Sequence, residues 1–298
     1  MDYGRLIATA ERYGAENEKN ALLAPYTTFR IGGPCDLLVK PASAECLTEL
    51  VKVCREDSLP FHILGKGSNI LVADEGLRCV VIVPSFAECQ VRDDRLVCGA
   101  GASLVSVCRV ALDNSLTGLE FAFGIPGTVG GALYMNAGAY GGEMKDVAVS
   151  CTYIDKKGNL CQMAAEDMNL SYRHSIFEDN GGIITSVTIQ LKKGSREEIS
   201  AKMNELMNRR RDKQPLDLPS AGSTFKRPEG DFAARLIEAS GLKGFSVGGA
   251  AVSEKHSGFV VNKDKATFAD VMKLIECVKE KVYADSGIML ECEVKIWQ

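Results

Sequence analysis

The stretch Gly124-Ile-Pro-Gly-Thr-Val-Gly-Gly-Ala-Leu-Tyr-Met-Asn-Ala-Gly-Ala-Tyr-Gly-Gly142 holds seven of the chain's 29 glycines. Glycine weakens both helices and strands, so a cluster this dense needs another reason. We expect a backbone that takes unusual dihedral angles and lies directly against a ligand. Pro126-Gly127 predicts a turn, Gly130 and Gly131 leave room for a flat group, and Asn136 offers an amide to ring heteroatoms. A glycine-rich surface loop is the alternative.

A second glycine turn, Gly65-Lys66-Gly67-Ser68-Asn69, follows the apolar segment 61–64. It is not a dinucleotide fingerprint, because Ile70 stands where the last glycine is required, and it is not a Walker loop, because Gly67 follows Lys66. Consecutive backbone N–H groups at a strand end suit a diphosphate. Two such turns indicate a large phosphorylated cofactor, although an ordinary tight turn stays open for this one.

The bulk composition is that of a soluble globular protein of two domains or three small ones. The 298 residues are 46% hydrophobic and 25% charged, and the net charge of −4 argues against nucleic acid as the main partner. The eleven cysteines show no Cys-x-x-Cys pair and no zinc spacing, which fits packing residues in a reducing cytosol. The first residues have no apolar signal region, so we expect a cytoplasmic protein.

Hydrophobic periodicity predicts α/β units followed by a separate C-terminal part. The expected helices cover residues 3–19, 43–57, 103–112, 195–211, 231–240 and 267–285. The expected strands cover residues 37–40, 61–64, 70–72, 80–83, 147–155, 160–163, 183–191 and 289–297. Hairpin turns are expected at 93–94 and, between two of these strands, at 156–158. A boundary is expected at 192–194.

Three polar motifs outside the glycine runs stay ambiguous on their residues alone. Ser223 is either a proton donor or a turn serine, and Arg173 either binds a carboxylate or lies in a solvated loop. Glu293 alternates with apolar neighbours in the last segment and would ordinarily be exposed. The three histidines form no metal set.

Taken together, the ordered motifs resemble the UDP-N-acetylenolpyruvoylglucosamine reductase family, flavoenzymes of bacterial peptidoglycan precursor synthesis. The motifs are Thr27-Thr-Phe-Arg30-Ile-Gly-Gly33, Gly65-Lys-Gly-Ser-Asn69, Ile125-Pro-Gly-Thr-Val-Gly-Gly-Ala132, Met135-Asn-Ala-Gly-Ala-Tyr140, Tyr172-Arg173, Ala221-Gly-Ser223, Gly258-Phe-Val-Val-Asn262 and Glu291-Cys-Glu293. The resemblance covers most of the chain.

The resemblance implies an α+β fold, with a two-part FAD-binding domain of the vanillyl-alcohol-oxidase (PCMH) type and a C-terminal α+β substrate domain. We expect an N-terminal helical segment over 1–28, the FAD domain over 29–194 (split near 86) and the substrate domain over 195–298. NADPH reduces non-covalently bound FAD, and hydride then passes to the vinyl carbon of the UDP-sugar. The implied protein is a cytoplasmic monomer with roles in cell shape and cell division and with no nucleic-acid or membrane partner.

The resemblance also implies roles for individual residues. Arg173 and Glu293 polarise the substrate carboxylate, which requires a protonated glutamate, and Ser223 protonates the enolate carbon. Substrate contacts are implied for Lys213, Lys226 and Arg227. Cofactor contacts are implied for Arg30, Gly65, Lys66, Gly67, Ser68, Asn69, Pro126, Gly127, Thr128, Gly130, Gly131, Asn136 and Gly138.

The sequence departs from the family pattern, and two rival functions stay open. The interval from Phe177 to Gly194 is too short for the tyrosine loop of some members, and Cys35 and Arg227 replace more usual residues. One rival is an FAD oxidase of the same fold acting on an alcohol or sugar, in which His62 would tether the flavin. The other is a nucleotide-sugar-binding protein without redox activity.

Overall fold

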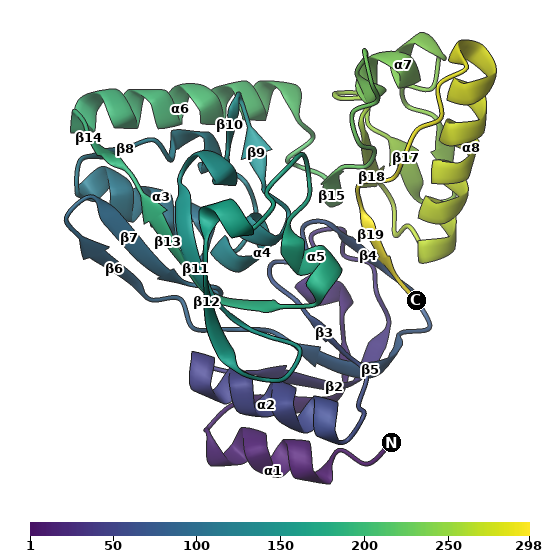
Figure 1. The fold of residues 1–298 in the computed structure, drawn as a ribbon. Helices are drawn as coiled ribbons and strands as arrows, with labels where there is room; N and C mark the ends of the chain where they lie inside the picture. The colour runs from purple at the N-terminus through teal and green to yellow at the C-terminus, as the bar shows by residue number, and fades with distance from the viewer. The chain divides into compact units, whose positions relative to one another are not determined.

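The computed structural model describes residues 1–298, which divide into two compact units that interleave along the chain (Figure 1). Unit 1 consists of Met1–Lys19, Leu37–Gly65 and Cys79–Arg209. Unit 2 consists of Asn20–Asp36, Lys66–Arg78 and Arg210–Gln298. The units therefore differ from the contiguous ranges 1–28, 29–194 and 195–298 that we expected, because two short early segments join the C-terminal residues.

The first part of the chain forms a four-stranded sheet and two helices. The sheet order is β1-β2-β5-β3, and β3 runs parallel to β5. The helix α2 begins after Ser43, whose side chain accepts a hydrogen bond from the Cys46 N–H, and it lies beside α1 (Figure 1). The elements are α1 (Gly4–Arg12), β1 (Glu16–Leu22), β2 (Pro34–Lys40), α2 (Ala44–Glu56), β3 (Phe61–Ile63) and β5 (Leu77–Ile82).

The second part of unit 1 is a five-stranded antiparallel sheet of order β12-β11-β13-β7-β6. Its strands are β6 (Cys89–Arg92), β7 (Arg95–Gly99), β11 (Ala148–Ile154), β12 (Leu160–Ala164) and β13 (Ile183–Gln190). The expected hairpin turns at 93–94 and 156–158 are confirmed. The helices are α3 (Leu104–Asp113), α4 (Val129–Tyr134), α5 (Ile176–Asn180) and the long α6 (Arg196–Lys213), which ends in unit 2. Short strands complete this part: β8 (Leu116–Thr117), β9 (Gly138–Ala139), β10 (Gly142–Glu143) and β14 (Lys192–Lys193).

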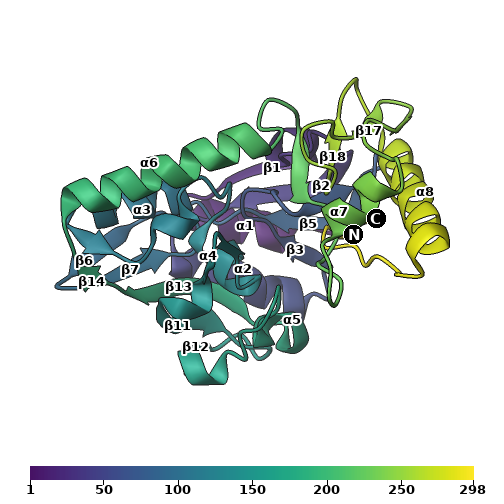
Figure 2. The same ribbon diagram turned by 90° about the horizontal axis from the view of Figure 1, so that it is seen from above.

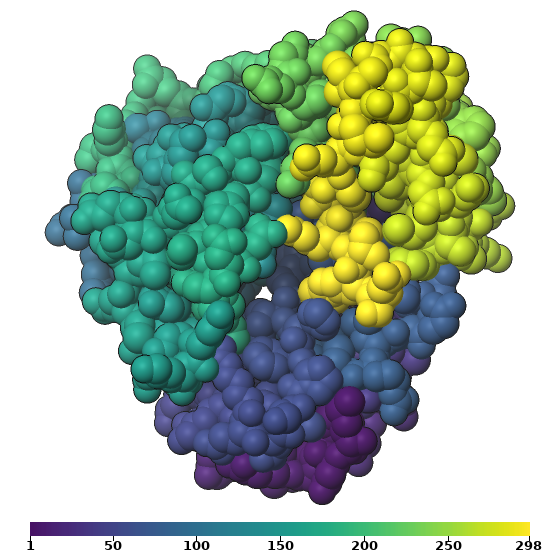
Figure 3. All heavy atoms as spheres, turned by 45° about the vertical axis from the view of Figure 1, so that its right-hand side comes forward, coloured from purple at the N-terminus to yellow at the C-terminus, as the bar shows by residue number.

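Unit 2 packs helices α7 (Ala233–Ala239) and α8 (Phe268–Ser286) with an antiparallel sheet of order β15-β18-β17-β16. Figure 2 shows α8 running along one side of β17 and β18, and Figure 3 shows the C-terminal residues, from the last part of α8 onward, in yellow. The sheet strands are β15 (Ser220–Ser223), β16 (Ser246–Val247), β17 (Ala250–Val252) and β18 (Phe259–Asn262). A separate parallel pair joins β4 (Ile70–Val72) to β19 (Lys295–Trp297).

Each unit has its own apolar core. In unit 1 the cluster includes Leu37, Leu47 and Val107, all completely buried. In unit 2 the buried residues of α8 belong to one cluster with Phe29, Ile31 and Leu71 from the two early segments. None of the helices combines the length and the apolar character needed to cross a bilayer.

Two expected elements are wrong in part. The helix over 3–19 ends at Arg12, because Gly14 takes a left-handed φ of 66° and residues 16–22 join a sheet as β1. The strand over 289–297 is reduced to Lys295–Trp297, with an isolated bridge between Cys292 and Phe225 before it. Burial still alternates, since Leu290 and Val294 are buried and Glu291 is exposed.

Candidate functional site

The two glycine segments meet inside unit 1. A Cβ added at Gly65 would lie 2.7 Å from Oγ1 of Thr128, so the end of β3 lies directly against the start of α4. The Thr128 hydroxyl accepts a hydrogen bond from the Gly131 N–H at 3.2 Å. A Cβ added at Gly127 would make only ordinary van der Waals contacts, and Pro126 and Gly131 are exposed. These residues form one surface of unit 1 with few side chains on it.

Gly130, which we expected to leave room for a flat group, packs closely against other protein atoms. Gly130 is buried, its N–H donates to the carbonyl of Ala100 at 3.0 Å, and an added Cβ would lie 2.8 Å from the Ala100 Cβ. Protein atoms, not a flat ligand, therefore occupy the place of the missing side chain. The same holds for Gly138, where an added Cβ would lie 2.7 Å from the carbonyl oxygen of Gly142.

The Asn136 amide, which we expected to face a cofactor ring, binds protein groups. The side chain is completely buried, and Nδ2 donates to Glu143 Oε2 at 2.7 Å and to the Ser171 carbonyl at 2.9 Å. Oδ1 accepts from the Lys145 N–H at 2.8 Å. The amide thus ties the glycine run to the turn that carries Arg173.

Arg173 lies in a tight turn closed by reciprocal backbone hydrogen bonds between Ser171 and His174, of 3.1 and 3.2 Å. Its φ of 56° is in the left-handed region, which is strained for a side chain of this size. The guanidinium approaches the carbonyl of Gly138 at 3.5 Å, and its carbon lies 5.2 Å from the centre of the Tyr172 ring. Buried Ser175 donates to the Tyr134 carbonyl at 2.7 Å and holds the turn from its other end.

Unit 2 brings Ser223 and Glu293 together. The Glu293 N–H donates to the carbonyl of Thr224 at 2.8 Å, so the two predicted residues belong to adjacent backbone segments. Ser223 follows an irregularity in the pairing of β15 with β18, where Gly222 has a φ of 78°. The Ser223 hydroxyl donates to the Phe225 carbonyl at 3.2 Å. Both Ser223 and Glu293 are half-buried.

The second glycine turn continues into unit 2 and contacts the same segments. Asn69 Nδ2 donates to the Glu293 carbonyl at 3.3 Å, and the Asn69 carbonyl accepts from the Lys295 N–H at 3.0 Å. Gly67 is buried with a φ of 59°, and an added Cβ would lie 2.2 Å from the Tyr26 carbonyl oxygen. The turn therefore positions the Glu293 segment. Lys66 is exposed and Ser68 is half-buried.

Thr28 is a residue that sequence reasoning missed. Its hydroxyl donates to the Ser220 carbonyl at 2.6 Å, and its N–H donates to the Gly67 carbonyl at 3.1 Å. Thr28 thus joins β15 to the second glycine turn. The signal was present in the motif Thr27-Thr-Phe-Arg30, where we selected Arg30 alone. Arg30 itself is exposed and has a φ of 57°.

The remaining predicted cations of unit 2 lie at its surface. Lys226 is half-buried, with Nζ 3.4 Å from Glu291 Oε2. Arg227 is exposed, and its guanidinium carbon lies 4.7 Å from the centre of the Phe232 ring. Lys213, the last residue of α6, is exposed. No group of three or more His, Cys, Asp or Glu side chains is placed to hold a metal ion.

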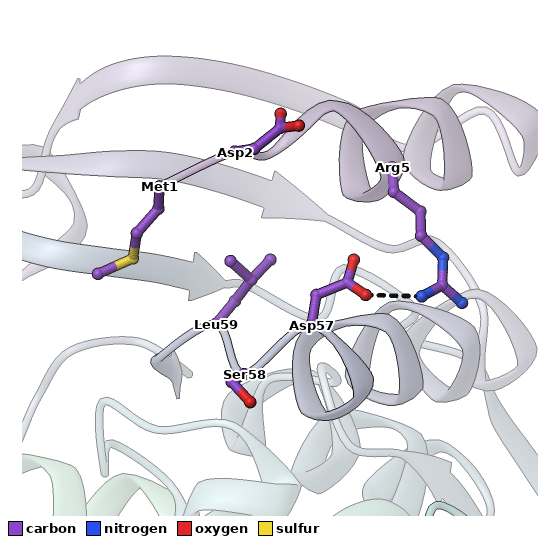
Figure 4. Close-up of a pocket in the computed structure, with 6 residues that line it drawn as sticks. All are labelled: Met1, Asp2, Arg5, Asp57, Ser58 and Leu59. Carbon is purple, nitrogen blue, oxygen red and sulfur yellow. Dashed lines mark hydrogen bonds and ion pairs between the residues drawn. The ribbon is translucent and has the colours of Figure 1, made fainter.

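A hollow of about 360 Å³ lies elsewhere on unit 1, at the start of α1 and the end of α2 (Figure 4). It is lined by Met1, Asp2, Arg5, Asp57, Ser58 and Leu59, and Arg5 donates to Asp57 at 2.7 Å across it. None of the predicted site residues lines this hollow.

Known proteins are similar to almost the whole chain. Residues 35–164 match the family model of an FAD binding domain, and residues 214–297 match the C-terminal domain of UDP-N-acetylenolpyruvoylglucosamine reductase. The UDP-N-acetylenolpyruvoylglucosamine reductase of Clostridium novyi (strain NT) is 48% identical over 282 residues, which cover 94% of this chain and 92% of that protein.

Solved structures agree with the sequence comparison. The crystal structure of UDP-N-acetylenolpyruvylglucosamine reductase from Thermus caldophilus has a TM-score of 0.82 and 37% identity, and it covers 95% of this chain and 99% of its own. A variant of berberine bridge enzyme has a TM-score of 0.52 at 16% identity, covers 64% of this chain and 44% of its own, and shares the fold alone. The expected fold class, an α+β fold that combines an FAD-binding domain with a C-terminal domain of this family, is confirmed.

Proposed function

Because this chain belongs to the UDP-N-acetylenolpyruvoylglucosamine reductase family, we propose that it reduces the enolpyruvyl group of UDP-N-acetylenolpyruvoylglucosamine to UDP-N-acetylmuramate. NADPH is the electron donor and FAD the cofactor. The observation that carries this proposal is the 48% identity to a relative of this name over 94% of the chain. We further propose that the enzyme acts as a cytoplasmic monomer in peptidoglycan precursor synthesis, and so contributes to cell shape and cell division.

The residues of unit 1 fit a flat, diphosphate-bearing cofactor. Gly65 and Thr128 lie in contact, and Pro126, Gly127 and Gly131 leave the adjoining surface uncovered. We assign FAD contact to these residues, together with Arg30, Lys66, Gly67, Ser68 and Asn69 as the resemblance implies. Bound FAD would supply the hydride. We propose that this surface is supported by Gly130 and Gly138, which pack closely against protein atoms, and by Asn136, whose amide is hydrogen-bonded within unit 1.

Three side chains are proposed to act on the substrate. Arg173 and Glu293 bind the carboxylate of the enolpyruvyl group and draw electron density toward it, which makes the alkene a better hydride acceptor. Glu293 serves this purpose as a protonated donor. Ser223 protonates the carbon next to that carboxylate, and its hydroxyl must turn away from the Phe225 carbonyl to do so.

The cations of unit 2 are proposed to bind the diphosphate of the UDP-sugar. The structure leaves Lys213 and Arg227 exposed and Lys226 half-buried. A lysine or arginine binds phosphate through a charge-assisted hydrogen bond. Lys226 would have to exchange its contact with Glu291 for the ligand.

The proposed function is tested by following flavin absorbance without oxygen. One equivalent of NADPH should bleach the FAD band, and the enolpyruvyl UDP-sugar should then restore it. Bleaching without recovery would retain a flavoenzyme and reject this substrate. A chain reconstituted with FAD that shows no flavin band would reject the cofactor, and the non-redox alternative would then stand.

A further inference from the structure

The cysteines at positions 89 and 98 face each other across the β6–β7 hairpin. They are direct partners in the antiparallel register, and their sulfur atoms lie 3.3 Å apart. The Gly99 N–H donates to the Glu88 carbonyl at 2.9 Å, so positions 88 and 99 form a hydrogen-bonded pair. Positions 89 and 98 therefore fall on the next, non-hydrogen-bonded pair, where Cα atoms are typically about 4.5 Å apart. That separation lies within the range that a disulfide spans, about 4.4–6.8 Å.

The two thiols also differ in access. β6 is an edge strand of its sheet, Cys89 is partly exposed, and Cys98 is completely buried. The hydrogen bond between the two thiols lowers the pKa of Cys89 and, together with burial, raises the pKa of Cys98. Burial raises the pKa of Cys54, Cys108 and Cys151 to about 12. Thiolate character and exposure together decide which cysteines are oxidised.

We propose that Cys89 and Cys98 are a reversible redox site, which hydrogen peroxide converts to a disulfide across the β6–β7 hairpin. The Cys89 thiolate attacks peroxide, its O–O bond breaks, and a sulfenic acid forms while hydroxide leaves and takes up a proton. The Cys98 sulfur then attacks the Cys89 sulfur, an S–S bond forms, and the sulfenic oxygen leaves as water. Two thiols lose two electrons and two protons in total, and one peroxide becomes two waters. A dithiol reductant reverses the change.

The test compares wild-type protein with two single variants. Cys161 provides the matched control, because it lies on β12, the opposite edge strand of the same sheet, and is also partly exposed. Its cross-strand partner is Tyr153 instead of a second cysteine. Each protein is treated with a small excess of hydrogen peroxide, alkylated under denaturing conditions and analysed by intact mass and peptide mapping.

In the wild type, we expect the eleven alkylatable thiols to fall by two and a cross-linked peptide to join residues 89 and 98. Dithiothreitol should restore both thiols. Cys161→Ser should retain the cross-link, and Cys89→Ser should lose it.

Peptide mapping of the wild type decides the question even if Cys89→Ser fails to fold. Sulfenic or sulfinic acid at Cys89 without a link to Cys98 would overturn the proposal. So would a cross-link that joins other cysteines, or a loss of two thiols that persists in Cys89→Ser.

Discussion

Ser223 lies at the irregular end of β15, and its hydroxyl donates to a backbone carbonyl of its own segment. Its proposed role concerns only the second half of the reaction, after the flavin has been reduced. Ser223→Ala should therefore leave flavin reduction by NADPH unchanged and slow substrate reduction by roughly 10²- to 10⁴-fold, the usual contribution of general acid catalysis. Stopped-flow absorbance measures the two half-reactions separately.

Ser220→Ala is the control for this prediction, because Ser220 lies in the same strand, contacts Thr28 through its backbone carbonyl, and loses only a 3.4 Å hydrogen bond from the Gly222 N–H to its hydroxyl. We expect both half-reactions to be preserved in it. An equal loss in the two half-reactions of Ser223→Ala would remove the serine from the proposed role.

Asn136 makes a separate prediction at this scale. Asn136→Asp keeps the acceptor for the Lys145 N–H but loses the amide hydrogens that bond Glu143 and Ser171. Two carboxylates would then face each other in a buried place, and we expect a loss of about 1–3 kcal/mol in the free energy of unfolding. If Asn136 positions the Arg173 turn, substrate reduction should also slow more than flavin reduction does.

Asn180→Asp is the matched control for Asn136→Asp. The Asn180 side chain accepts a hydrogen bond from the Gly182 N–H at 2.7 Å, which a carboxylate also accepts. Stability and both rates should therefore change little. Asn136→Asp could instead lower stability and slow both half-reactions equally. That result would show a structural role only and would refute the positioning role.

At the scale of elements, two glycines near the start of α4 are expected to have different roles. Gly130 is needed for packing, and Gly127 for contact with the ligand. Gly130→Ala should lower the free energy of unfolding by about 1–3 kcal/mol, because the new methyl group would meet Ala100 in a buried place. Gly127→Ala has room for its methyl group, so it should preserve stability and weaken FAD binding instead. Urea titration and fluorescence titration with FAD measure the two effects. Unchanged FAD affinity in Gly127→Ala would exclude Gly127 from the cofactor surface.

The elements also show what the sequence predicts well. The helix over 43–57 and the two hairpins depend on a capping serine, apolar spacing and short turns, which are local signals. The first part of the strand β1 (Glu16–Leu22), residues 16–19, was expected to continue the helix over 3–19, and β1 is mostly polar with only Ala21 buried. Its conformation is set by pairing with another strand, which local sequence does not encode.

The site shows the same difference between local signals, which the sequence carries, and contacts between distant segments, which it does not. Ser223, Glu293 and Arg173 were selected by family resemblance, since spacing alone left each of them ambiguous. The structural roles of Asn136 and Thr28 depend on partners 35 and 192 residues away, at Ser171 and Ser220. Periodicity and motif spacing carry no information about such partners, which explains why these contacts of Asn136 and Thr28 were not predicted.

At the scale of the whole molecule, the two units interleave along the chain. We therefore expect that the C-terminal region does not fold alone, as a contiguous domain would. A fragment of residues 210–298 contains most of unit 2 but lacks Phe29, Ile31 and Leu71, which are buried in its core. It also lacks β4, the parallel partner of β19. Each missing large side chain contributes about 1.5–3 kcal/mol through burial, and together they approach the whole stability of a small domain, about 5–15 kcal/mol.

We therefore expect the 210–298 fragment to lack a cooperative urea transition and a dispersed amide NMR spectrum, whereas the full chain shows both. Linking residues 20–36 and 66–78 to the fragment through flexible spacers should restore the transition, because these segments supply the missing core residues and β4. A sharp transition in the unlinked fragment would show that the C-terminal region folds alone. The early segments would then serve the site more than the stability of unit 2, and the contiguous domain over 195–298 would be the better description.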